Sequence, residues 1–174
     1  MIRRLVIRDL ALMDRAELEL GAGFTVVTGE TGAGKSVLLG ALSLLAGHRA
    51  AKTVVRKGAE ESVVEAEFEI GEDPRFDVLL QELDLPVCDE GLLLLKRSVH
   101  ASKAGRISIN GGSATLAQLQ QLQEGSSPAL SQVQNLSGTK VLRSRNRHRW
   151  QQLRLHLLHP QHQNRRQPQA QYLL

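Results

Sequence analysis

The sequence predicts an α/β fold for residues 1–124 and a separate basic tail over residues 125–174. In two segments, 16–20 and 64–70, apolar and acidic side chains alternate, which is typical of strands with one buried and one wet face. The β-branched run at 24–28 is followed by a glycine-rich loop and then by an apolar stretch that indicates a buried helix. A strand, a loop and a helix in this order are the basic unit of an α/β fold.

The expected elements follow from short-range patterns along the chain. Gly47 is placed to end the long helix, because glycine readily adopts the left-handed conformation found after helix C-termini. Pro74 stands near the start of a short helix, and Asn110 to Gly112 indicates a turn. The full set is strands at 5–7, 16–20 and 24–28, a helix at 37–46, a strand at 64–70, a helix at 74–83, strands at 92–95 and 106–110, and a helix that opens at Thr115.

Composition and charge exclude several classes of protein. Hydrophobic residues make up 41% of the chain, and the single cysteine, Cys88, allows no internal disulfide and no cysteine-rich zinc site. No run reaches the roughly 18 apolar residues of a membrane-spanning helix, so we expect a cytoplasmic protein without a membrane partner. The charge is unevenly divided. Residues 1–124 hold 14 Lys and Arg against all 18 Asp and Glu, whereas residues 125–174 hold 8 Lys and Arg and no acid.

The tail has a different character from the rest of the chain. Ser126 to Pro128 indicates a linker, and the remainder is rich in Gln, Arg, His and Ser without a sustained apolar pattern. We therefore interpret residues 125–174 as largely disordered. Trp150 and the leucines at 153–158 are compatible with a short amphipathic helix. The tail's arginines are either a solvated segment or a site that binds polyanions through charge.

The strongest chemical signal is a loop of the form G-x-x-x-x-G-K-[ST] between the strand at 24–28 and the long helix. Its glycines let the backbone wrap around an anion, and N–H groups of the loop and helix N-terminus point at the phosphates. We expect Lys35 to bridge the β- and γ-phosphates of ATP and the Ser36 hydroxyl to ligate Mg²⁺. The predicted ATP-binding residues are Gly29, Glu30, Thr31, Gly32, Ala33, Gly34, Lys35, Ser36 and Val37.

Several segments around this loop match one known family. They are 5–14, 23–28, 47–50, 55–59, 64–68, 106–111 and 115–119. Together with Glu30-Thr31, which is the family's own form of the loop, they make residues 1–123 similar to the N-terminal part of the RecN family. These proteins are bacterial DNA-repair ATPases of the SMC-like branch of the ABC-type ATPases.

The resemblance implies a P-loop NTPase head of the ABC/SMC type, of which residues 1–124 are the N-terminal half, with an antiparallel sheet in the first lobe. In the family, two heads sandwich ATP and Mg²⁺, and ATP hydrolysis is coupled to DNA during double-strand-break repair. The implied partners are DNA, a second head and the C-terminal half, at the nucleoid. Arg56 resembles an arginine that related heads place near the nucleotide. The alternative, which we weigh equally, is that Arg56 is a surface arginine beside Lys57 with no role at the nucleotide.

The resemblance ends near Leu122. Three features of the family have no counterpart here: the glutamine that contacts Mg²⁺ and water, the Asp-Glu pair after an apolar strand, and the signature motif. Leu136 to Thr139 is not counted as a signature motif, because it lacks the helix that precedes one. We identify no catalytic residue in this chain, expect it to be catalytically incomplete alone, and interpret the tail as out-of-frame sequence. Two other hypotheses stay open: a small P-loop kinase or phosphotransferase, and a non-catalytic polyanion binder that acts through the tail.

Overall fold

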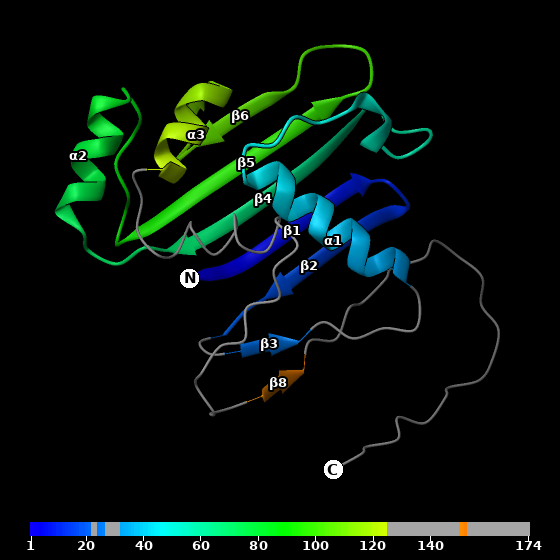
Figure 1. Cartoon of the computed structure of the whole chain (residues 1–174), viewed down its shortest axis with the longest axis horizontal. Coiled ribbons are helices and arrows are strands. Elements are labelled where there is room, and N and C mark those ends of the chain that lie inside the picture. Colours follow the sequence, from blue (N-terminus) through cyan, green and yellow to red (C-terminus); the bar gives the residue numbers. More distant parts are fainter. Residues whose placement is uncertain (22–23, 27–31, 125–149, 153–174) are drawn as a thin grey trace.

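The computed structural model describes residues 1–21, 24–26, 32–124 and 150–152, which form an α/β arrangement (Figure 1). The main sheet has six strands in the order β2-β1-β4-β5-β6-β7, and each neighbouring pair is antiparallel. A second sheet pairs β3 with β8 in parallel. The strands are β1 (Ile2–Leu10), β2 (Met13–Glu19), β3 (Phe24–Val26), β4 (Glu61–Glu69), β5 (Leu92–His100), β6 (Arg106–Ile109), β7 (Gly112–Ala114) and β8 (Trp150–Gln152).

The helices of the described part lie on and beside the main sheet. They are α1 (Gly32–Leu45), α2 (Pro74–Glu82), α3 (Leu116–Glu124) and a single 3-10 turn, η1 (Lys52–Val54). α1 crosses the middle of one face of the sheet and packs against β1, β4 and β5. α3 lies close to the C-terminal end of α1 (Figure 1). None of the described helices is long and apolar enough to cross a membrane.

The core fills the space between α1, α3 and the inner face of the sheet. On β4, Val64 and Phe68 are fully buried, whereas the glutamates between the apolar positions are on the opposite face. On β5, Leu93 and Leu95 are fully buried and Leu94, on the opposite face, is 47% exposed. The alternation predicted for 64–70 is therefore confirmed on β4, and β5 shows the same alternation, which the sequence analysis did not predict. The result is an antiparallel sheet with one wet face.

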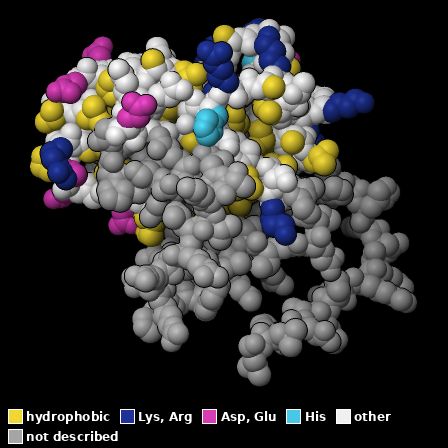
Figure 2. All heavy atoms as spheres, in the orientation of Figure 1, with side chains coloured by type: hydrophobic (Ala, Val, Ile, Leu, Met, Phe, Trp, Pro, Cys, Tyr) yellow, Lys and Arg dark blue, Asp and Glu magenta, His cyan; other side chains and the backbone are white. Residues whose placement is uncertain are grey.

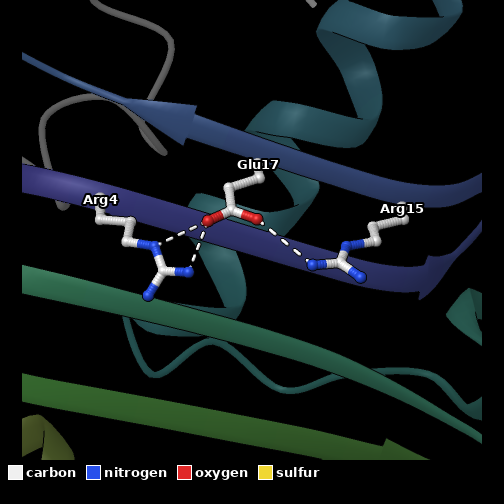
Figure 3. A network of polar contacts seen from close by, with 3 residues as sticks. All are labelled: Arg4, Arg15 and Glu17. Atoms are coloured by element: carbon white, nitrogen blue, oxygen red, sulfur yellow. Dashed lines mark hydrogen bonds and ion pairs between the residues drawn. The ribbon is translucent and has the colours of Figure 1, made fainter. Parts of the chain in front are cut away.

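The outer face of the sheet is held by charged side chains. Arg4 on β1 and Arg15 on β2 both reach Glu17 on β2, with α1 visible behind the strands (Figure 3). The hydrogen bonds from Arg4 and then from Arg15 hold the pKa of the Glu17 carboxyl below its usual range. Because these groups are solvent-exposed, the network specifies the strand register more than it adds stability.

A two-residue turn accounts for a strand that the sequence analysis missed. Asn110 and Gly111 both have positive φ, at 48° and 83°, and Ile109 pairs with Gly112 across them. This is the geometry of a tight hairpin, for which Asn-Gly is the preferred sequence. The turn expected at 110–112 is therefore confirmed at its first two residues, and β7 follows as a short edge strand.

Local capping sets the helix starts. The Asp73 carboxylate accepts a hydrogen bond from the Arg75 N–H at 3.1 Å, with Pro74 in the first turn of α2. Thr115 and Gln118 form a reciprocal pair before α3: the Thr115 N–H donates to Gln118 Oε1 at 2.8 Å, and the Gln118 N–H donates to Thr115 Oγ1 at 3.2 Å. The helices expected at 74–83 and from Thr115 are thus confirmed to within a residue.

Several expectations differ from the structure. The strand expected at 16–20 is Met13–Glu19, and the strand expected at 92–95 continues to His100. The strand expected at 5–7 runs over Ile2–Leu10, because its polar positions lie on the wet face and do not interrupt it. The helix expected from residue 37 begins at Gly32, within the glycine-rich loop motif. Trp150, placed in a possible helix, is in β8 instead. The remainder of the tail lies outside the described residues, so a domain boundary at residue 124 and a disordered tail stay predictions.

Replacing Phe68 by alanine is expected to lower the free energy of unfolding by about 3–5 kcal/mol, because it opens a cavity among fully buried residues. Its neighbour Glu67, on the opposite face of β4, provides the matched control: Glu67→Ala is expected to change the same quantity by no more than about 0.5 kcal/mol. Urea titration followed by circular dichroism measures both. Equal losses in the two variants would contradict the assignment of the inner face.

Candidate nucleotide-binding site

The phosphate loop motif lies where a strand passes into a helix. β3 ends at Val26 and α1 begins at Gly32, which confirms the predicted strand before the motif and the predicted helix after it. Of the predicted ATP-binding residues, Gly29, Glu30 and Thr31 lie outside the described residues. The other six, from Gly32 to Val37, form the first turns of α1.

The solvent exposure of the side chains changes within residues 35–37, from exposed to buried. Lys35 and Ser36 are exposed, so their polar groups face the solvent side of the helix start. Val37 is only 8% exposed and belongs to the core. Its side chain therefore anchors the start of α1 to the sheet. As the sixth residue of the helix, Val37 lies beyond the first turn, whose N–H groups have no partner within the helix. A contact between Val37 and ATP stays a prediction.

The start of α1 fits a phosphate group. Its first turn carries no acidic residue, so the positive end of the helix dipole is not offset there. A Cβ added at Gly34 would meet no atom within 4 Å, which means that packing does not require glycine at this position. The open space is compatible with close approach of a ligand to the backbone. A lysine amine suits phosphate oxygens, and a serine hydroxyl suits Mg²⁺.

The C-terminal end of α1 is fixed by side chains from two other elements. Arg97 Nη1 on β5 donates to the Leu44 carbonyl at 2.5 Å, and Gln123 Nε2 on α3 donates to the Leu45 carbonyl at 2.6 Å. Gln120 Nε2 donates to the Gly47 carbonyl at 3.2 Å. Carbonyls in the last helical turn have no i+4 partner within the helix. The Leu44 carbonyl also accepts the Gly47 N–H at 3.1 Å, and the three side chains add donors to the carbonyls of Leu44, Leu45 and Gly47. We call Arg97, Gln120 and Gln123 the α1 clamp.

The sequence analysis missed the α1 clamp, although one signal was available. Arg97 occupies a core-facing position of β5, two residues after Leu95, and it is 7% exposed. A lone arginine at an inward position indicates a buried partner, and here burial lowers the pKa of its guanidinium below the usual value. Gly47, with φ at 72°, ends the helix as predicted.

A mostly apolar hollow of about 320 Å³ runs along α1 from Ser36. Its opposite wall is the turn between β1 and β2, where Asp9 and Ala11 have positive φ values of 49° and 53°. Two backbone bonds hold this turn: the Ala11 N–H donates to the Val54 carbonyl at 2.7 Å, and the Arg56 N–H donates to the Asp9 carbonyl at 2.9 Å. The turn is therefore tied to the segment after η1.

The Arg56 side chain pairs with two carboxylates of this turn. Its Nη1 lies 3.1 Å from Asp14 Oδ1 and 3.4 Å from Asp9 Oδ1. These contacts give Arg56 a local role in holding the β1–β2 turn. A contact between Arg56 and a nucleotide stays a prediction.

Comparison with known proteins identifies the relatives of this fold and motif. Residues 4–167 match the model of the AAA domain family. The DNA repair protein RecN of Xylella fastidiosa is 43% identical over 122 residues, which is 70% of this chain and 22% of that protein. RecN of Streptomyces coelicolor is 40% identical over 116 residues, 67% of this chain and 20% of that protein. The chain thus spans about a fifth of the length of these relatives.

Among solved structures, a chain from a study of ATP-driven dimerisation and DNA-stimulated activation of SMC ATPases aligns with a TM-score of 0.58 at 18% identity. The alignment covers 73% of this chain and 81% of that chain. At this identity the match concerns the fold alone, and it agrees with the expected head architecture. The chain belongs to the AAA domain family, and it is similar to the DNA repair protein RecN over about 70% of its length.

Proposed function

We propose that this chain binds ATP with Mg²⁺ through Gly29–Ser36 at the start of α1. The observation that carries the proposal is the motif's placement at the transition from β3 to α1, with Lys35 and Ser36 exposed on the first turns. Lys35 holds the β- and γ-phosphates as a point charge, Ser36 offers its hydroxyl to the metal, and the helix N–H groups bind the phosphate oxygens. When bound, Mg²⁺ would supply positive charge that offsets the charge of the phosphates.

The wider role proposed for the chain is that of one half of an ATPase head in DNA repair. Its relatives are named DNA repair proteins, and the SMC ATPases that share its fold are described as dimerising with ATP. We infer that ATP bound at α1 supports association with a second head and with the remaining half of the head. The expected setting is DNA in the cytoplasm.

The substitution Lys35→Ala is expected to weaken ATP binding by at least about tenfold, because one charge-assisted contact to phosphate is worth about 1.5–3 kcal/mol. Isothermal titration of the full chain with ATP and Mg²⁺ measures the effect. Lys96→Ala is the matched control, since it removes a lysine from the wet face of β5, where Lys96 Nζ lies 3.6 Å from Glu65 Oε2.

Thermal melts of all three proteins establish whether each variant is folded. Equal ATP affinity in the unmodified chain and in a folded Lys35→Ala variant would contradict the proposed site.

The ion pairs of Arg56 lead to a separate prediction, which concerns the coupling energy between Arg56 and Asp14. Because Arg56 and its two carboxylates are about one third to one half exposed, a double-mutant cycle between Arg56→Ala and Asp14→Ala is expected to give a coupling of at most about 1 kcal/mol. Chemical denaturation at low and high salt measures it, and the coupling should fall with added salt. A large, salt-independent coupling would show that the pair is effectively buried.

A further inference from the structure

Asn110 and Gly111 form the turn between β6 and β7, and this pair of residues is chemically reactive as well as suited to a hairpin. An asparagine side chain can react with the backbone nitrogen of the residue that follows it. Glycine permits this reaction best, because it has no side chain to hinder the approach. The chain has three other asparagines, and the residues that follow them are Leu136, Arg147 and Arg165. Asn110 is therefore the asparagine of this sequence that is most open to the reaction.

The folded chain holds the Asn110 side chain in place. Its Oδ1 accepts a hydrogen bond from the Leu94 N–H at 2.8 Å, and its Nδ2 donates to the carbonyls of Pro86 at 2.9 Å and Val87 at 3.0 Å. The carboxamide thus ties the turn to β5 and to the segment between α2 and β5. Both ends of the amide are engaged, so its carbon cannot swing toward the Gly111 nitrogen unless these bonds break.

Crowding does not protect Gly111. A Cβ added to Gly111 would meet no atom within 4 Å, so there is open space beside this residue. At Gly112 the neighbouring segment comes much closer, since an added Cβ would lie 2.6 Å from Pro86 Cδ. This close packing of Pro86 against β7 keeps the two carbonyl acceptors next to the hairpin. The site is therefore closed by the hydrogen bonds of the carboxamide and by the contact that maintains them.

We propose that Asn110 is a deamidation site that the fold keeps closed and that reacts when the hairpin opens. In the reaction the Gly111 nitrogen attacks Asn110 Cγ, and the new C–N bond closes a succinimide ring. The side-chain nitrogen leaves as ammonia and takes the proton of the Gly111 amide with it. Water then adds to either carbonyl of the ring and breaks the C–N bond to that carbonyl. The products are aspartate and isoaspartate, and water is the only other reactant.

The products cannot restore the closed hairpin. A carboxylate has no proton to donate, so the two carbonyls lose the donor that they share. Isoaspartate also adds a methylene to the backbone of the turn. The new charge enters an acidic surrounding, because residues 84–90 hold Asp84, Asp89 and Glu90 and no lysine or arginine. Figure 2 shows acidic side chains gathered on the left, where Figure 1 places α2. Like charges repel, so an opening that ends in reaction is retained as a weakened hairpin.

The first test measures deamidation of the full chain by mass spectrometry of its peptides, in native buffer and in concentrated urea, with water that carries a heavy oxygen isotope. Ring hydrolysis places one heavy oxygen in the product, which distinguishes new reaction from earlier change. We expect Asn110 to react at least about tenfold more slowly in the folded chain, because several hydrogen bonds must break first. Asn135, which precedes Leu136, is the internal control and should change little in either solvent. Equal rates at Asn110 in the two solvents would overturn the proposal.

The variant Gly112→Ala tests what keeps the site closed. The added Cβ would push Pro86 away from the hairpin, so Asn110 should react at least about threefold faster in the folded variant and at an unchanged rate in urea. Replacing Pro86 by alanine as well removes the Cδ that the new Cβ meets, and this double variant should return to the slow rate. Thermal melts identify a temperature at which all the proteins are folded. A folded Gly112→Ala variant with the native rate, or a double variant that stays fast, would contradict the proposal.

The variant Asn110→Asp reproduces one of the two products. In urea titration it should lower the ratio of folded to unfolded chain on the order of tenfold, because two hydrogen bonds are lost and a like charge is added. Gln121→Glu makes the same change from amide to carboxylate at an exposed position of α3, and it should leave the ratio within about twofold. An unchanged ratio in Asn110→Asp would show that the product restores the hairpin, which the proposal excludes.

Discussion

The rest of the structure depends on how the C-terminal end of α1 is fixed. Its last carbonyls have no i+4 partner within the helix, and the α1 clamp supplies side-chain donors to this end from β5 and α3, in addition to the Gly47 N–H that the Leu44 carbonyl accepts. An unmade hydrogen bond at such a position costs about 1–3 kcal/mol, a large fraction of the stability of a small domain. The clamp thus couples three elements that are far apart in the sequence. No buried side-chain nitrogen or oxygen in the described part lacks a partner, so the arrangement is internally complete.

This constraint also fixes the orientation of the whole helix. Val37, Ala41 and Leu45 lie along the buried side of α1 and fix its rotation against the sheet. Rotation and end position together determine where Lys35 and Ser36 lie at the N-terminus. The α1 clamp and the proposed phosphate-binding residues therefore lie at opposite ends of one helix.

Much of this fold was predictable from sequence because its signals are local. Alternation of apolar and acidic residues identified β4, the apolar stretch after the glycine-rich motif identified α1 although not its first five residues, and Asn110-Gly111 located the hairpin turn. The ends of β1 were less predictable, because Arg3, Arg4 and Arg8 look like loop residues in the sequence. Only the structure shows that they are exposed positions of a strand. The α1 clamp was not predictable, since it assembles residues from β5 and α3 that have no fixed spacing. The nucleotide motif could be recognised from one continuous segment, whereas the clamp depends on tertiary contacts.

Hydrogen exchange of the full chain tests the central role of the clamp most directly. In Gln123→Leu the donor to the Leu45 carbonyl is lost and a side chain of similar size remains in the buried position. The account predicts that amides in the last two turns of α1 exchange at least about tenfold faster, which corresponds to a loss of about 1.4 kcal/mol, while those of α2 are unchanged. Unchanged protection of α1 in this variant would contradict the account, because the helix end would then be held without the clamp.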